Sequence, residues 1–128
     1  MHGTFVGQLL LVGMGGFIGS SLRYALSIGV QRAAPNSFFP YGTMTVNIAG
    51  CFCIGLLAGL IESRQSLDPG LVLFLMVGVL GGFTTFSTYA LESLVLAESG
   101  MLLKALANTV LQVVVGLLAA WAGLLIIR

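Results

Sequence analysis

The sequence has 128 residues, of which 58% are hydrophobic and only 7% charged, and its formal net charge is +1. An average soluble domain is about 45–50% apolar and about 25% charged. This composition excludes an ordinary soluble protein and predicts an integral membrane protein.

Four apolar tracts predict four spanning helices, at about residues 4–30, 43–61, 70–97 and 101–127. Each tract reaches or nearly reaches the ~20 residues that cross a bilayer. The first tract lacks the basic start of a secretory signal and exceeds its apolar core of about 7–15 residues, so it is read as a helix. The connections are too short for a soluble catalytic or nucleic-acid-binding domain. We therefore predict one all-α membrane domain over 1–128, whose function lies within the bilayer.

The first predicted helix contains a single ionisable side chain, Arg23. Placing an arginine in hydrocarbon costs about 2.5–3.5 kcal/mol on insertion scales, so a functional or partnered role is expected. The nearby segment GMGGFIG has the spacing of a dinucleotide-binding loop, but that loop needs a βαβ unit, which is not predicted here. Glycines four apart instead favour close helix packing. The pairs are Gly3/Gly7, Gly15/Gly19, Gly55/Gly59 and Gly78/Gly82.

The second and fourth predicted helices each carry a polar stripe, because residues four apart share a helix face. The stripe of the second helix consists of Thr43, Asn47 and Cys51. The stripe of the fourth consists of Lys104, Asn108, Gln112 and Gly116. Cys51 and Cys53 point in different directions on a helix, so we interpret them as small packing residues rather than a metal site.

The third predicted helix contains GGFTTFSTYALE, residues 81–92, which is unusually polar for its surroundings. Each of the adjacent glycines destabilises a helix interior by about 1 kcal/mol relative to alanine. The two threonines that follow can bond backbone carbonyls and unwind a turn. We therefore expect a break near 81–85, about mid-membrane, where the freed carbonyls line a cavity. A third polar stripe follows, formed by Thr85, Thr88, Tyr89 and Glu92.

Two interpretations of the stripes stay open. Polar groups in membranes can simply join helices, at about 0.6 kcal/mol for each hydrogen bond on average. They can also line the pathway of a substrate or ion. The alignment of polar groups on three of the four predicted helices favours the pathway.

The charges at the helix ends give no clear orientation. With four spans, Arg64 and Arg128 fall on one side of the membrane, and Arg32 and Lys104 on the other. Since an excess of Lys and Arg marks cytoplasmic loops, a balanced chain is expected to insert both ways. We predict an antiparallel, dual-topology homodimer with two-fold symmetry. The two helix breaks would then meet near the axis, where clustered carbonyl oxygens suit Na⁺.

The polar groups suit a small anion better than a cation. Phe86 and Tyr89 lie on one helix face, and aromatic rings have positive edges. The amide of Asn47 and the hydroxyls of Ser and Thr donate hydrogen bonds. Cation channels more naturally use rings of acidic side chains, whereas Glu92 is the only acidic residue whose position in the membrane is in question.

Three segments resemble the CrcB/Fluc fluoride channels along the whole chain: GGFIGSSLRY in the first helix, YGTMTVNIAGCFCIG in the second and GGFTTFSTYALE in the third. The resemblance implies an antiparallel dimer with two fluoride pores and a structural Na⁺ held by the backbone carbonyls of Gly81 and Thr84. It implies a hydroxyl track through the pore and Glu92 near one mouth. Tyr89 departs from the family, which usually has phenylalanine there. The predicted pore residues are Phe86, Tyr89, Asn47, Thr43, Thr88, Ser87, Thr85, Arg23, Gln112, Asn108 and Glu92.

The functional hypothesis is a passive, fluoride-selective channel, multi-pass in the inner (plasma) membrane, which protects the cell from fluoride. Its partners are fluoride, a second copy and the lipid bilayer, with no nucleic acid. One alternative is a small multidrug-type, proton-coupled exporter, which needs an acidic residue in the first helix that this chain lacks. Another is a non-transporting subunit of a membrane assembly. An enzyme is disfavoured, because no nucleophile, base and orienting group can be assembled.

Overall fold

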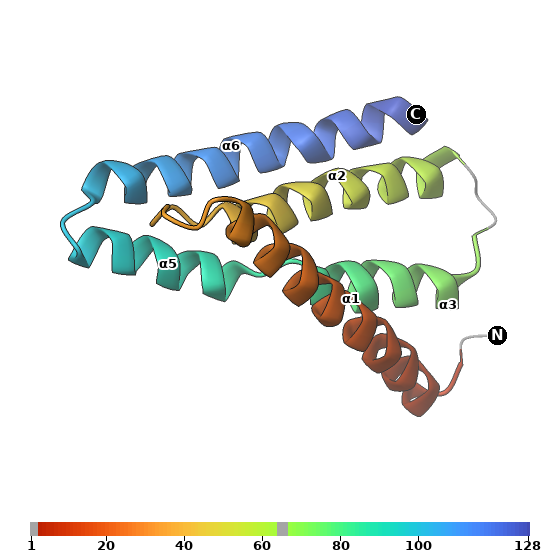
Figure 1. The fold of residues 1–128 in the computed structure, drawn as a ribbon. Helices are drawn as coiled ribbons and strands as arrows, with labels where there is room; N and C mark the ends of the chain where they lie inside the picture. Colours follow the sequence, from red (N-terminus) through yellow and green to blue (C-terminus); the bar gives the residue numbers. More distant parts are fainter. Residues whose placement is uncertain (1–2, 64–66) are drawn as a thin grey trace.

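The computed structural model describes residues 3–63 and 67–128, and every regular element in that range is helical (Figure 1). The elements are α1 (Phe5–Ala33), α2 (Tyr41–Ser63), α3 (Pro69–Val72), the π-helical η1 (Leu73–Leu80), α4 (Gly81–Phe83), α5 (Phe86–Glu98) and α6 (Leu102–Ile127). In these ranges four helices are long and apolar enough to cross a membrane, namely α1, α2, the composite Pro69–Glu98 and α6. The prediction of an all-helical chain with four candidate spans is confirmed.

The third span is interrupted between α4 and α5. Thr84 (φ −88°, ψ 161°) and Thr85 (φ −151°, ψ 120°) have extended backbones between the two helical segments. The Thr85 hydroxyl accepts a hydrogen bond from Thr88 N at 3.3 Å and so caps the start of α5. The interruption therefore lies on the threonines of the predicted segment, whereas Gly81 and Gly82 stay helical.

The glycines of α4 and η1 instead allow α1 to approach closely. A Cβ on Gly82 would stand 2.8 Å from the Gly16 carbonyl oxygen, and one on Gly78 would stand 2.9 Å from Gly15 Cα. Real Cβ atoms do not come so close to backbone, so only glycine permits this crossing. Figure 1 shows α1 running diagonally across the third span.

Helices α2 and α6 lie side by side (Figure 1), again with glycine at the contact. A Cβ on Gly55 would collide with the Ala120 carbonyl, and one on Gly59 would stand 2.8 Å from the Leu124 carbonyl oxygen. The predicted small-residue packing thus occurs at these positions of α2. At Gly3, by contrast, no atom of the described neighbours lies within 4 Å of an added Cβ.

The side chain of Gln31 makes three hydrogen bonds to the connection from α1 to α2 and to the start of α2. Its amide nitrogen donates to the carbonyls of Ser37 and Phe39 at 3.3 and 3.2 Å, and its oxygen accepts from Gly42 N at 3.2 Å. Gln31 therefore fixes where α2 begins, and with it the height of the polar stripe on that helix.

The outer surface of the single chain is strongly apolar. Among its exposed large side chains are Phe17, Phe86 and Leu103, at 74%, 78% and 81% of full exposure. Such a surface is stable only against hydrocarbon or another apolar surface. Among the buried side chains, Thr43, Asn108 and Gln112 are the polar ones, whereas Ser87 and Thr88 next to the interruption stay exposed.

Candidate functional site

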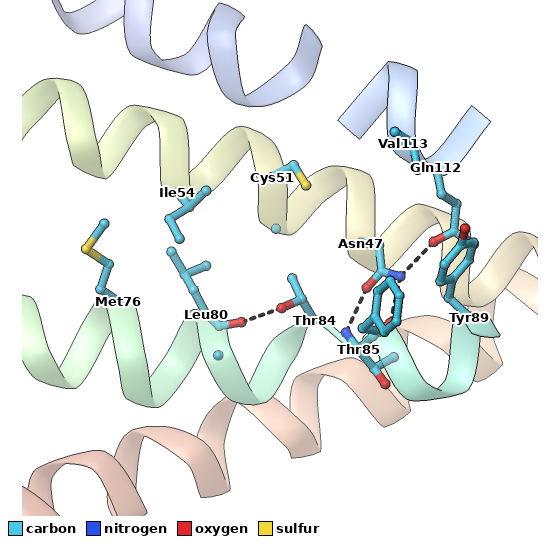
Figure 2. Close-up of a pocket in the computed structure, with 13 residues that line it drawn as sticks. Asn47, Cys51, Ile54, Met76, Leu80, Thr84, Thr85, Tyr89, Gln112 and Val113 are labelled. Carbon is cyan, nitrogen blue, oxygen red and sulfur yellow. Dashed lines mark hydrogen bonds between the residues drawn. The ribbon is translucent and has the colours of Figure 1, made fainter. Parts of the chain in front are cut away.

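The interruption is anchored by one side chain of α2, Asn47. Its oxygen Oδ1 accepts from Thr85 N at 2.8 Å, and its nitrogen Nδ2 donates to the Thr85 carbonyl at 2.9 Å. A backbone group left without a hydrogen bond in the membrane costs on the order of several kcal/mol. Asn47 therefore stabilises the extended backbone that the helix break exposes (Figure 2).

Asn47 also begins a chain of amide hydrogen bonds that reaches α6. Asn47 Nδ2 donates to Gln112 Oε1 at 2.7 Å, and Gln112 Nε2 donates to Asn108 Oδ1 at 2.9 Å. Asn108 Nδ2 donates to Ser93 Oγ at 2.9 Å, and the Ser93 hydroxyl donates to the Tyr89 carbonyl at 2.9 Å. The polar stripes of α2, α5 and α6 are thus joined into one network.

A cavity of about 330 Å³ lies beside this network, between α2, the third span and α6 (Figure 2). Four apolar side chains form one part of its wall, those of Ile54, Met76, Leu80 and Val113. The predicted site residues Asn47, Gly81, Thr84, Thr85, Phe86, Tyr89 and Gln112 line the same cavity, together with Gly50 and Cys51. An apolar cavity with a few convergent polar groups is the usual form of a small-ligand site.

Two aromatic rings meet at this cavity. The ring centroids of Phe86 and Tyr89 lie 5.3 Å apart, with an interplanar angle of 58°. In this tilted arrangement the edge of one ring approaches the face of the other. Phe86 is 78% exposed in the single chain, so its ring is available to a surface outside the subunit.

A second cavity, of about 360 Å³, lies on the α1 side of the interruption and contains Arg23. The Arg23 guanidinium donates to the Thr84 carbonyl at 3.4 Å, and thus also contacts the break. Most of the wall is hydroxylated, with Ser20, Tyr24, Ser27, Thr43, Thr85 and Thr88 among the lining residues. Four predicted residues therefore line this cavity, namely Arg23, Thr43, Thr85 and Thr88, and Thr85 also lines the cavity that holds Phe86 and Tyr89.

Glu92 lies in a third cavity, of about 600 Å³, under the connection from α1 to α2. The buried Thr43 hydroxyl donates to Glu92 Oε1 at 2.7 Å, whereas Glu92 Oε2 is buried and has no hydrogen-bond partner among the described residues. Lys104 lies near this region, with its Nζ 5.9 Å from the centroid of the Phe38 ring. Thr43 lines both this cavity and the one around Arg23, so it connects the two.

Two predicted pore residues line none of these cavities. Asn108 is fully buried and serves the amide chain, and Ser87 is exposed at the start of α5. Ser93, which the sequence analysis did not select, completes the amide chain. Its position four residues after Tyr89, on the same face of the helix, was a signal that could have found it.

The oxygen atoms proposed for a cation belong to the main chain. In the residues that the structure describes, no group of three or more His, Cys, Asp or Glu side chains could hold a metal ion. Because Thr85 N donates to Asn47, it does not close the helical hydrogen bond to the Gly81 carbonyl. From the residues that the structure describes, the Thr84 carbonyl accepts only the 3.4 Å hydrogen bond of Arg23. Both carbonyls thus keep lone pairs for a hard cation, which prefers oxygen ligands.

The sequence matches one protein family over most of its length. The profile described as "CrcB-like protein, Camphor Resistance (CrcB)" covers residues 10–124. The chain belongs to this family.

Several relatives of this CrcB-like chain have the name "Fluoride-specific ion channel FluC". The protein from Rhizobium meliloti (strain 1021) is 44% identical over 122 residues, covering 94% of this chain and 96% of the relative. The one from Nitratidesulfovibrio vulgaris is 45% identical over 117 residues, covering 91% and 94%. A Campylobacter jejuni relative is 46% identical over 124 residues, covering 94% and 97%. The resemblance predicted from the motifs is therefore confirmed.

Proposed function

We propose that this CrcB-like chain is a subunit of a fluoride-selective channel that lets F⁻ leave the cell passively. The observation that carries the proposal is the aromatic and amide-lined cavity beside the interrupted third span, in a chain whose relatives are named fluoride-specific channels. The function needs no covalent chemistry. It requires only a path on which a small anion exchanges water for protein donors.

The arrangement of donors sets the mechanism. Moving an unpaired ion from water into a medium of low dielectric constant costs on the order of tens of kcal/mol. In the cavity of Phe86, Tyr89 and Gln112, neutral donors and ring edges replace the hydration shell without a full positive charge, so the ion is bound loosely enough to leave. On the Arg23 side the guanidinium attracts the anion, and the Thr88 hydroxyl, which accepts from Thr85 and donates to none of the described residues, offers a hydrogen bond. Beyond the break, the edges of Phe86 and Tyr89 and the Gln112 amide continue the path.

The channel is proposed to be an antiparallel homodimer with dual topology. The apolar exterior supports a partner surface, and the exposed Phe86 ring supports a pore completed by the second copy. Of the charges that balance the two sides, Arg32, Lys104 and Arg128 belong to the described residues, whereas Arg64 lies outside them. A chain with so even a distribution has little to fix its orientation in the inner membrane.

A structural Na⁺ is proposed at the centre of that dimer. The carbonyls of Gly81 and Thr84 would hold it, since the helix break leaves their lone pairs available. The ion would supply positive charge that offsets the carbonyl dipoles of two facing breaks. The residues of the chain then keep the break extended, through Asn47 on one side and Arg23 on the other.

Efflux from liposomes tests the function. Purified protein is reconstituted into vesicles loaded with KF and KCl, and a fluoride electrode records release when valinomycin allows K⁺ to follow. We expect rapid F⁻ release with chloride retained, and strong loss of release for Phe86→Ile. Silence toward F⁻ would refute the channel. Proton-driven uptake of a lipophilic cation would instead support a multidrug-type exporter.

Orientation is tested separately, in cells. A single cysteine is placed at residue 128 of a variant without Cys51 and Cys53, and an impermeant thiol reagent is added to intact spheroplasts. Dual topology predicts labelling of about half of the molecules. Complete labelling or complete protection would refute the antiparallel dimer. Neither result would affect the conclusion drawn from the efflux assay.

A further inference from the structure

Most side-chain hydrogen-bond donors around the cavity that holds Phe86 and Tyr89 are already used by the protein. The Thr84 hydroxyl donates to the Leu80 carbonyl at 3.0 Å, and the Thr85 hydroxyl donates to Thr88 Oγ1 at 3.1 Å. A hydroxyl has one hydrogen to give. These two threonines therefore shape the wall of the cavity but have no donor left for an anion inside it.

Asn47 is fully committed as well. A carboxamide has two N–H donors, and those of Asn47 point to the Thr85 carbonyl at 2.9 Å and to Gln112 Oε1 at 2.7 Å. Its oxygen accepts from Thr85 N at 2.8 Å. Asn47 is thus a positioning residue in this subunit, and the donors for an anion must come from elsewhere on the wall.

Two conventional side-chain donors remain among the described residues on this wall. The Tyr89 hydroxyl makes no hydrogen bond to any residue that the structure describes, and Gln112 Nε2 gives only one of its two hydrogens, to Asn108. Both residues line the cavity, and Figure 2 shows the Tyr89 hydroxyl at the end of the ring next to Gln112. The thiol of Cys51 is a weak donor by comparison.

The direction of the amide chain is fixed by the main chain. The N–H of Thr85 can only donate and its carbonyl can only accept, so Asn47 has a single orientation that satisfies both. Asn47 then presents a donor to Gln112, which must turn its oxygen toward Asn47 and its nitrogen toward Asn108. A flipped Gln112 would place two donors against each other and two oxygens against each other. The NH₂ group of Gln112 is therefore held as a donor.

We propose that the Tyr89 hydroxyl and the free N–H of Gln112 form the hydrogen-bonding pair that receives the anion in this cavity. Asn47 and Asn108 position Gln112, and the packed rings position Tyr89. The pair suits a small anion that is a strong hydrogen-bond acceptor, because two neutral donors replace part of its hydration without trapping it. This inference rests on the proposed fluoride conduction and assigns the tyrosine hydroxyl a role in binding.

The test uses Tyr89→Phe, which keeps the ring and removes one donor. Initial efflux rates are measured against internal fluoride concentration for the wild type, Tyr89→Phe and Tyr41→Phe. Tyr41 undergoes the same chemical change but lies outside the cavity, at the start of α2. Loss of one neutral hydrogen bond corresponds to a rise of about five- to tenfold in the half-saturating fluoride concentration. Tyr41→Phe is expected to match the wild type.

The outcomes separate the two proposals. A silent wild type overturns the channel itself. A conducting wild type with an unchanged half-saturating concentration in Tyr89→Phe overturns only the donor pair. Because the hydroxyl has no protein partner in the described structure, thermal unfolding of Tyr89→Phe is expected to match the wild type. A lower melting temperature with unchanged concentration dependence would show a structural role and would equally overturn the inference.

Discussion

Replacing Asn47 with aspartate exchanges one nitrogen for oxygen and removes two hydrogen bonds at the helix break. In the wild type, the Thr85 carbonyl and Gln112 Oε1 accept from Asn47 Nδ2 at 2.9 and 2.7 Å. In Asn47→Asp both would face a carboxylate oxygen that has no hydrogen to give. The bond from Thr85 N to Oδ1, at 2.8 Å, is retained.

The cost follows from these contacts. Leaving a buried acceptor without its partner destabilises a protein by about 1–3 kcal/mol. Two such acceptors lower the free energy of unfolding by roughly 2–6 kcal/mol on that basis. Gln112 also loses the contact that fixes its orientation, so the donor that it presents to the cavity is misplaced. We expect fluoride efflux to fall by about tenfold or more, which corresponds to 1.4 kcal/mol or more.

The assay pairs liposome efflux with thermal unfolding in detergent. Asn36→Asp is the matched control, since Asn36 lies exposed in the connection before α2 and undergoes the same chemical change. It is expected to leave both readouts unchanged. If Asn47→Asp conducted fluoride and unfolded like the Asn36 control, the role of Asn47 in holding the break would be refuted.

Three further predictions follow from packing and hydrogen bonding. Gly55→Ala would collide with α6 and is expected to lower the free energy of unfolding by about 1–3 kcal/mol. Gly13→Ala is the control, because no atom of the described residues lies within 4 Å of its new Cβ, and it is expected to leave the melting temperature unchanged. Equal melting curves for the two variants would contradict the close contact at Gly55. In the described part of the chain Thr43→Val removes the only hydrogen bond to the Glu92 side chain and should lower the free energy of unfolding by about 1–3 kcal/mol; thermal unfolding measures it, and no change would show that water already solvates this carboxyl group. Arg23→Gln weakens the contact with the break and removes the positive charge of that cavity, so fluoride efflux should fall severalfold; undiminished efflux would exclude Arg23 from the path.

The sequence alone determined the membrane class, the helices and the family. Apolar tracts of sufficient length leave helices as the only way to satisfy the backbone in hydrocarbon, so the four spans could be predicted from composition and length. The motif around residues 81–92 indicated the interruption, because threonines and adjacent glycines weaken a helix locally. The stripe containing Asn47 and the one containing Gln112 were visible as spacings of four.

Only the tertiary structure decided which polar groups meet and which hydrogens remain free. Spacing places residues on a helix face, but it does not fix the rotation of that helix against its neighbours. The glycine contacts set that rotation, and they join Asn47 to Gln112 while they separate Arg23 from Tyr89 into two cavities. The sequence named Asn47 as a donor to the anion, whereas its bonds in the fold are taken by Thr85 and Gln112. Hydrogen-bond direction is a property of the whole network, so it follows from the packed arrangement and not from any one helix.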